Sequence, residues 1–179
     1  MNRELKNYVE IQAEKAENLS FCSGIKLLHI RNSVEELLSF IGRGGIFEEY
    51  TLHSIAHIDE MLKIVEWLIP DETKKVMTHA EWLMLTLAVY FHDLGMVVTK
   101  DEYAKRNSTS FKGYKEKLLN EDKYVEYKEY VTSEADEHFL YQEFVRENHA
   151  RRIRIWLEGK EDINLGDASS VRNEINKGM

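Results

Sequence analysis

At 179 residues the chain is long enough for one domain, or for the first part of one. Hydrophobic residues make up 43% of it, and a single proline among many Leu, Glu, Lys and Ile favours a helical core. The net charge of −8 argues against binding to duplex nucleic acid, for which a basic patch is expected. One cysteine, Cys22, excludes an internal disulfide, and no apolar run predicts a membrane span or a signal core, so we expect a cytoplasmic protein.

The N-terminal part predicts two helices of moderate amphipathicity. Residues 3–19 place apolar side chains at helical spacing among many charges, as in a helix that faces a partner. Further on, Ser33 and Glu36 have the spacing of a capping box. We therefore expect the second helix to begin at Val34 and to stop at the glycine-rich loop that follows.

Two stronger helices come next. The first rises from Thr51 and ends before Pro70, which we expect to form a turn. The second begins at a capping box formed by Thr78 and Glu81. It runs over residues 79–93 and is apolar on nearly all sides, which predicts a central, buried helix.

The part of the chain from residue 99 onward changes in character. Residues 99–132 are dominated by charged and tyrosine side chains, and we expect a long, partly helical insertion over the mouth of a functional site. A long helix should follow from Ser133 to about Leu157, with Gly159 as the residue that ends it. The polar residues 159–179 predict a loosely ordered end.

A pair of polar side chains stands out at the end of the apolar helix, where His92 is followed directly by Asp93. A charge buried at such a place is costly unless it is paired or binds a metal. A second histidine, His57, lies on the preceding strong helix. Imidazole suits Zn, Fe or Ni, and carboxylate suits Mg or Mn, so the three residues together predict a metal site. For any one histidine the alternative is a hydrogen-bonded core residue.

The stretches 50–57 (Tyr-Thr-Leu-His-Ser-Ile-Ala-His) and 87–96 (Leu-Ala-Val-Tyr-Phe-His-Asp-Leu-Gly-Met) resemble the HD superfamily of metal-dependent phosphohydrolases. They are most similar to the HD branch associated with Hsp90-like (GHKL) ATPases. The resemblance covers about residues 31–100, with a weaker echo at 149–152. It implies an all-α fold, a compact orthogonal helical bundle of the HD type over residues 31–179, preceded by a helical extension over residues 1–30.

The resemblance also implies a ligand set. His57, His92 and Asp93 would hold one or two divalent ions (Mn, Mg, Fe, Ni or Zn), and Asp93 would also position the attacking water. His53, one turn before His57, either completes a two-metal site or faces the substrate. His149 is similar to a later histidine of the family, with an ordinary surface histidine as the alternative.

Two arginines are candidates for catalysis. Arg151 and Arg152 would bind the phosphate oxygens, with a role in surface solubility as the alternative. The family closes its site with a distal aspartate, for which this chain offers Asp162 and Asp167 in polar surroundings. Either the chain is a fragment truncated at its C-terminus, or Asp167 takes that place, or the site is incomplete. Many HD hydrolases carry a lysine where this chain has Met96, which argues against a cyclic-dinucleotide phosphodiesterase.

Three functions fit these observations. The first is a metal-dependent phosphohydrolase that acts on a nucleotide or another phosphate ester through a metal-activated water. The second is a catalytically weak or inactive HD module for ligand sensing or partner docking in a larger ATPase-coupled assembly. The third is an HD-type mixed-valent di-iron oxygenase. The expected partners are a phosphorylated small molecule or nucleotide and a protein partner or ATPase domain, without a membrane or duplex nucleic acid.

Overall fold

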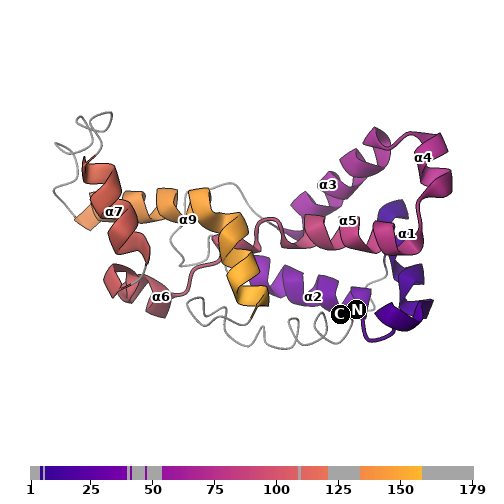
Figure 1. Ribbon diagram of the computed structural model, residues 1–179, viewed down its shortest axis with the longest axis horizontal. Helices are drawn as coiled ribbons and strands as arrows, with labels where there is room; N and C mark the ends of the chain where they lie inside the picture. Colours follow the sequence, from indigo (N-terminus) through magenta and orange to yellow (C-terminus); the bar gives the residue numbers. More distant parts are fainter. Residues whose placement is uncertain are drawn as a thin grey trace. The chain divides into compact units, whose positions relative to one another are not determined.

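The structure, a computed structural model, describes residues 5, 7–39, 41, 47, 54–108, 110–120 and 134–158. Over these ranges the chain forms helices and no strand, so the predicted all-α fold is confirmed (Figure 1). None of the described helices has the length and apolar content needed to cross a bilayer. The α-helices are α1 (Tyr8–Glu14), α2 (Leu27–Leu38), α3 (Ile55–Leu68), α4 (Asp71–Val76), α5 (His79–Phe91), α6 (Lys100–Ala104), α7 (Ser110–Asn120) and α9 (Glu134–Leu157).

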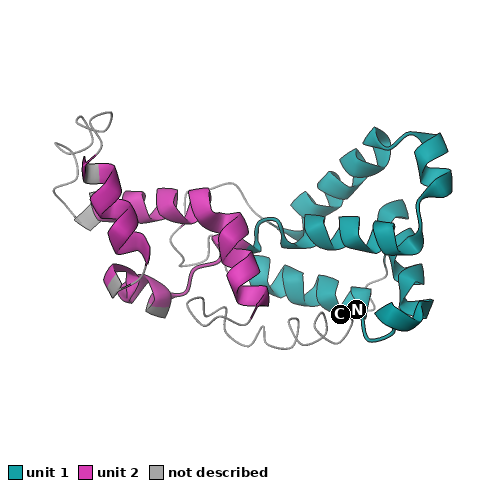
Figure 2. Ribbon diagram, in the orientation of Figure 1, with its two compact units in different colours: residues 1–39, 51–94, 166–179 teal, residues 40–50, 95–165 magenta. Residues whose placement is uncertain are grey.

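The chain divides into two compact units (Figure 2). Unit 1 comprises residues 1–39, 51–94 and 166–179, and unit 2 comprises residues 40–50 and 95–165. Helices α1 and α2 pack in the same unit as α3 and α5. The predicted helical extension over residues 1–30 and HD-type domain over residues 31–179 stay a prediction. The boundary between the two units falls directly after Leu94.

Helix α1 lies within the stretch predicted to be amphipathic. Its N-cap is Asn7, whose side-chain oxygen accepts a hydrogen bond from the Val9 amide at 2.9 Å. The helix packs on α5, where the ring of Tyr8 meets the ring of Trp82 edge-on at 5.7 Å between centroids. The buried side chains of Val9 and Ala13 lie on the inner face. The N-terminal helix is therefore part of the core of unit 1.

The predicted start of the second helix is wrong. Helix α2 begins at Leu27, and Ser33 lies in its interior. The first turn is capped from another segment, because a carboxylate oxygen of Glu17 accepts a hydrogen bond from the Leu27 amide at 2.9 Å. The apolar side chains of Leu27, Ile30 and Val34 recur at helical spacing and are all buried. Tertiary capping and burial therefore outweigh the local capping pattern at Ser33.

The two strong helices appear where the sequence predicts them. Helix α3 ends at Leu68, before Pro70 as expected, although residues 51–53 lie outside the described part of the chain. Pro70 is not a simple turn, since it caps the short helix α4. The capping box of α5 is confirmed: Thr78 Oγ1 accepts from the Glu81 amide at 3.3 Å, and the Glu81 carboxylate accepts from the Thr78 amide at 2.7 Å. Figure 1 shows α3 and α5 running in opposite directions, inclined to each other and joined through α4.

Helices α3 and α5 keep part of their apolar surface exposed. The prediction that α5 is buried on nearly all sides holds for one side only, because Met84 is 71% exposed. Helix α3 buries two of its side chains, Ile58 and Leu62. Its exposed apolar side chains are Ile64, Trp67 and Leu68, and Trp67 is 81% exposed. Few interior contacts therefore hold α3 in unit 1.

Unit 2 is built around α9, which agrees with the long helix predicted to end at Leu157. The described part of residues 99–132 is partly helical, as expected. In α7, Phe111 packs edge-on against Tyr141 and Phe144 of α9, with ring centroids 4.9 and 5.5 Å apart. This contact gives α7 a fixed place in unit 2. Its predicted position over the mouth of a site stays a prediction.

Candidate metal centre

Helix α5 ends at the pair of polar residues that the sequence singles out. His92 is the C-cap of the helix and keeps right-handed helical backbone angles. Asp93 follows in the next turn and is 9% exposed. A carboxylate at this depth requires a partner that compensates its charge.

Three predicted ligands converge within unit 1. Nε2 of His92 lies 2.7 Å from Oδ2 of Asp93, and Nε2 of His57 lies 3.6 Å from the same oxygen. The two imidazole rings are 5.5 Å apart between centroids. One ligand atom from each residue lies within 4.8 Å of the other two. The antiparallel run of α3 and α5 accounts for this convergence, because it brings the start of α3 beside the end of α5.

The hydrogen bond of His92 defines its tautomer. Nδ1 lies 2.6 Å from the carbonyl oxygen of Val89, which can only accept, so Nδ1 carries the proton. Nε2 of the neutral ring is then an acceptor, and it lies 2.7 Å from a second acceptor, Oδ2 of Asp93. Two acceptors at this distance repel each other unless a proton or a metal ion lies between them.

A proton held between Nε2 of His92 and Oδ2 of Asp93 gives the charged form of His92, and its partners affect the pKa of the ring. Burial lowers that pKa, but the hydrogen bonds to the Asp93 carboxylate and to the Val89 carbonyl together outweigh burial. The pKa of His92 is therefore raised above its ordinary value of 6.5. The same arrangement attracts a metal ion, because a carbonyl that orients the ring from the far side is typical of metal-bound histidine.

The spacing of the three groups fits one divalent ion. Ligand atoms at about 2.0–2.2 Å from an ion stand roughly 3–3.5 Å from one another. The distances of 2.7 and 3.6 Å to the shared carboxylate oxygen lie around that range. Two imidazoles and one carboxylate occur in catalytic zinc sites and in non-haem iron sites, both of which keep positions open for water or substrate.

The other predicted site residues lie either outside the described residues or in unit 2. His53, Asp162 and Asp167 lie outside the described residues. His149 and Arg151 lie on α9 in unit 2, whereas the cluster belongs to unit 1. Nδ1 of His149 lies 2.6 Å from the carbonyl oxygen of Arg146, and Arg151 is exposed. Their participation in the site stays a prediction.

Arg152 has a set of partners that the sequence does not reveal. Its guanidinium is buried and forms an ion pair with Glu102 at 2.5 Å. It also donates to the carbonyl oxygens of Gly95 at 2.6 Å and Val97 at 2.8 Å. These bonds fix the segment after the His-Asp pair to α9 within unit 2. They give Arg152 a structural role, while its predicted role in catalysis stays a prediction.

The same segment approaches α9 very closely. A Cβ atom at Gly95 would lie 2.0 Å from the carbonyl oxygen of His149 and 2.6 Å from its carbonyl carbon. Real Cβ contacts of this length with backbone do not occur. Glycine after His-Asp-Leu is therefore required by the path of α9.

A buried charge network in unit 1 escaped the sequence reasoning. Glu10 of α1 is 1% exposed and accepts hydrogen bonds from Tyr90 of α5 and Arg31 of α2. Arg31 also forms an ion pair with Asp59 of α3. The available signal was weak, because a single glutamate in a charged amphipathic helix is normally solvated.

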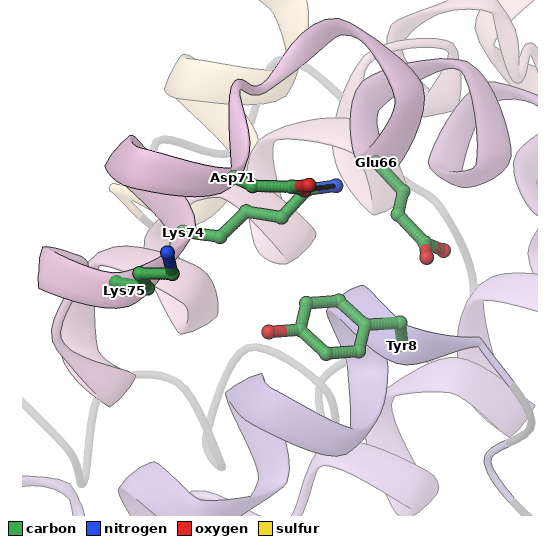
Figure 3. Close-up of a pocket in the computed structure, with 5 residues that line it drawn as sticks. All are labelled: Tyr8, Glu66, Asp71, Lys74 and Lys75. Carbon is green, nitrogen blue, oxygen red and sulfur yellow. Dashed lines mark hydrogen bonds and ion pairs between the residues drawn. The ribbon is translucent and has the colours of Figure 1, made fainter.

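A separate cavity of about 370 Å³ lies elsewhere in unit 1 (Figure 3). Its lining comes from α1, α3 and α4 and consists of Tyr8, Glu66, Asp71, Lys74 and Lys75. Two ammonium and two carboxylate groups balance in charge, and Lys74 is already bonded to Asp71 at 3.2 Å. The cavity therefore has no marked preference for an anion or a cation.

A family model described as HD-CE matches residues 47–177, a stretch that includes His57, His92 and Asp93. No curated protein and no solved structure matches the chain.

Proposed function

Because the chain belongs to the HD-CE family, we propose that it is a metal-dependent phosphohydrolase acting on a nucleotide or another phosphate ester. The observation that carries this proposal is the convergence of His57, His92 and Asp93 around one point. The predicted association with an Hsp90-like ATPase domain, as with any other protein partner, is a further part of the proposal.

Among the described residues the cluster offers three ligands, which supports hydrolysis over a purely structural metal site. Structural sites are closed by four protein ligands, whereas catalytic sites keep a position open. A divalent ion bound by His57, His92 and Asp93 would supply Lewis acidity and would lower the pKa of a water bound to it toward neutrality. His57 is partly exposed, so the cluster is accessible from solvent.

The side chains of the cluster have distinct roles in this proposal. His57 and His92 would provide nitrogen ligands from two helices, and the Val89 carbonyl keeps the ring of His92 oriented with Nε2 toward Asp93. Asp93 would provide the anionic ligand, and its carboxylate would accept a proton from the attacking water. The prediction that Arg151, an exposed arginine of α9, binds the phosphate oxygens is part of this proposal.

The test begins with the metal. Elemental analysis of the purified protein should find a divalent transition metal bound in stoichiometric amount. His92→Ala and Asp93→Ala should abolish this binding. Mutation of a residue that only orients a ligand lowers metal affinity roughly 10–100-fold, and loss of the ligand itself should lower the affinity further. His29→Ala is the matched control, because His29 is an exposed histidine of α2 that is not part of the cluster.

Catalysis is tested separately with the metal-loaded protein. Phosphate release should appear with at least one member of a panel of nucleotides and phosphate esters, and His92→Ala should abolish it. Stable metal binding without turnover on the whole panel would favour the sensing or docking module instead. A protein that binds no divalent metal would refute the proposed phosphohydrolase.

A further inference from the structure

We propose that Glu10 and Arg31 are positioning residues of the metal centre. Through Tyr90 and Asp59 they would hold α5 and α3 in the register at which His92 and His57 converge. This inference rests on the proposed function, since it concerns the geometry and affinity of the same centre.

The contacts form one continuous chain across four helices of unit 1. The Tyr90 hydroxyl donates to Oε1 of Glu10 at 2.5 Å, and Nε of Arg31 donates to the same oxygen at 2.8 Å. Nη2 of Arg31 forms an ion pair with Oδ1 of Asp59. Glu10 thus connects to α5 directly and to α3 through Arg31.

The contacts are related to the metal centre through the positions of Tyr90 and Asp59, which lie close in sequence to the proposed ligands. Tyr90 precedes His92 by two residues, and Asp59 follows His57 by two residues. Two residues correspond to about 200° around a helix, so each anchor lies on the opposite side from its ligand. A helix anchored in this way resists rotation about its axis, and such a rotation would move its imidazole away from the other.

The burial of Glu10 shows that the network has a cost. A carboxylate that is 1% exposed is stable only when its charge is compensated, and an apolar side chain of similar shape often packs as well or better. Buried ionic groups are best attested where they fix one register among several. Here the elements that need a fixed register are the two that carry the ligands.

The two residues also lie outside the family match. Glu10 belongs to α1 and Arg31 to α2, and the HD-CE match begins at residue 47. If the inference holds, the N-terminal helices α1 and α2 help to position the metal ligands, although they lie outside the stretch that matches the family.

The experiment compares metal binding with stability in the full chain. Co²⁺ is the probe, since its visible absorption reports the geometry of its ligands and its dissociation constant can be titrated. Arg31→Met should weaken Co²⁺ binding about 10–100-fold and change the absorption spectrum, as outer-shell changes do. Arg31→Lys should restore part of the Co²⁺ affinity and part of the wild-type spectrum. Leu37→Ala, a buried change in the same helix, should lower the melting temperature of the metal-free protein while leaving the spectrum unchanged.

Each outcome decides the inference. A folded Arg31→Met variant with the wild-type spectrum and affinity would overturn it, and so would an equal loss of affinity in Leu37→Ala. If Arg31→Met does not fold, Tyr90→Phe replaces it, because the ring is retained and one hydrogen bond is removed. We expect Tyr90→Phe to lower the Co²⁺ affinity about tenfold, and an unchanged affinity would also overturn the inference. A wild-type protein that binds no Co²⁺ would instead refute the proposed function.

Discussion

Replacing Gly95 by alanine should destabilise unit 2 severely. The new Cβ would lie 2.0 Å from the His149 carbonyl oxygen, 2.6 Å from the carbonyl carbon and 2.8 Å from Cα. All three atoms belong to the backbone of α9, so no side-chain rotation can relieve the overlap. Non-bonded carbon atoms settle at roughly 3.5–4.0 Å, and α9 would therefore have to shift by about 1 Å.

The size of the effect follows from two opposing terms. Alanine restricts the unfolded chain and by itself favours folding by about 0.4–1 kcal/mol. Overpacking a rigid site costs about 1–3 kcal/mol or more, and the shift would also strain the bond from Arg152 to the Gly95 carbonyl. We expect a net loss of about 2–2.5 kcal/mol, because the upper end of the overpacking range applies where backbone meets backbone.

Gly113 provides the matched control. It lies in α7, and a Cβ at this position would meet nothing within 4 Å. Gly113→Ala should stabilise the protein by about 0.5–1 kcal/mol, since glycine is a poor helix former. Urea unfolding followed by circular dichroism measures both variants. A Gly95→Ala variant within about 0.5 kcal/mol of wild type would refute the close approach of the two segments.

Arg152→Met should lower the free energy of unfolding by about 3–5 kcal/mol, because it leaves the buried Glu102 carboxylate without its partner. Arg151→Met, at an exposed position on the same helix, should change it by less than about 0.5 kcal/mol, and equal losses would contradict the ion pair. Thr78→Ala should cost about 1 kcal/mol, since α5 loses its N-cap acceptor; an unchanged melting temperature would contradict this cap. The raised pKa of His92 means that protons compete with the metal above pH 6.5, so Co²⁺ affinity should fall as the pH decreases from about 8 to about 6; a flat profile would exclude His92 as a ligand.

The helices show what local sequence signals can and cannot predict. The start of α5 was predictable, because Thr78 and Glu81 satisfy each other within one turn and no distant residue competes. The start of α2 was not, because its cap acceptor is Glu17, which precedes the helix by ten residues. Ser33 and Glu36 have the same capping-box spacing as Thr78 and Glu81, but the buried face of α2 extends on both sides of Ser33.

The candidate site shows the same division. His57, His92 and Asp93 were singled out correctly as residues that meet, since the ends of two strongly apolar helices and a family resemblance both indicated them. The partners of Arg152 and the network around Glu10 join residues 50 and 80 positions apart. Such pairings depend on the folded path of the chain, which helical spacing does not specify.

The sparse burial of α3 has a consequence for hydrogen exchange. An element with little buried apolar area opens locally at a lower free energy than the fold as a whole. Amide hydrogens of α3 should therefore exchange ahead of those in the middle of α5, through openings that carry His57 away from His92. An ion that needs both imidazoles binds the closed form alone, so occupancy of the centre would slow exchange in α3 in proportion to the ion concentration.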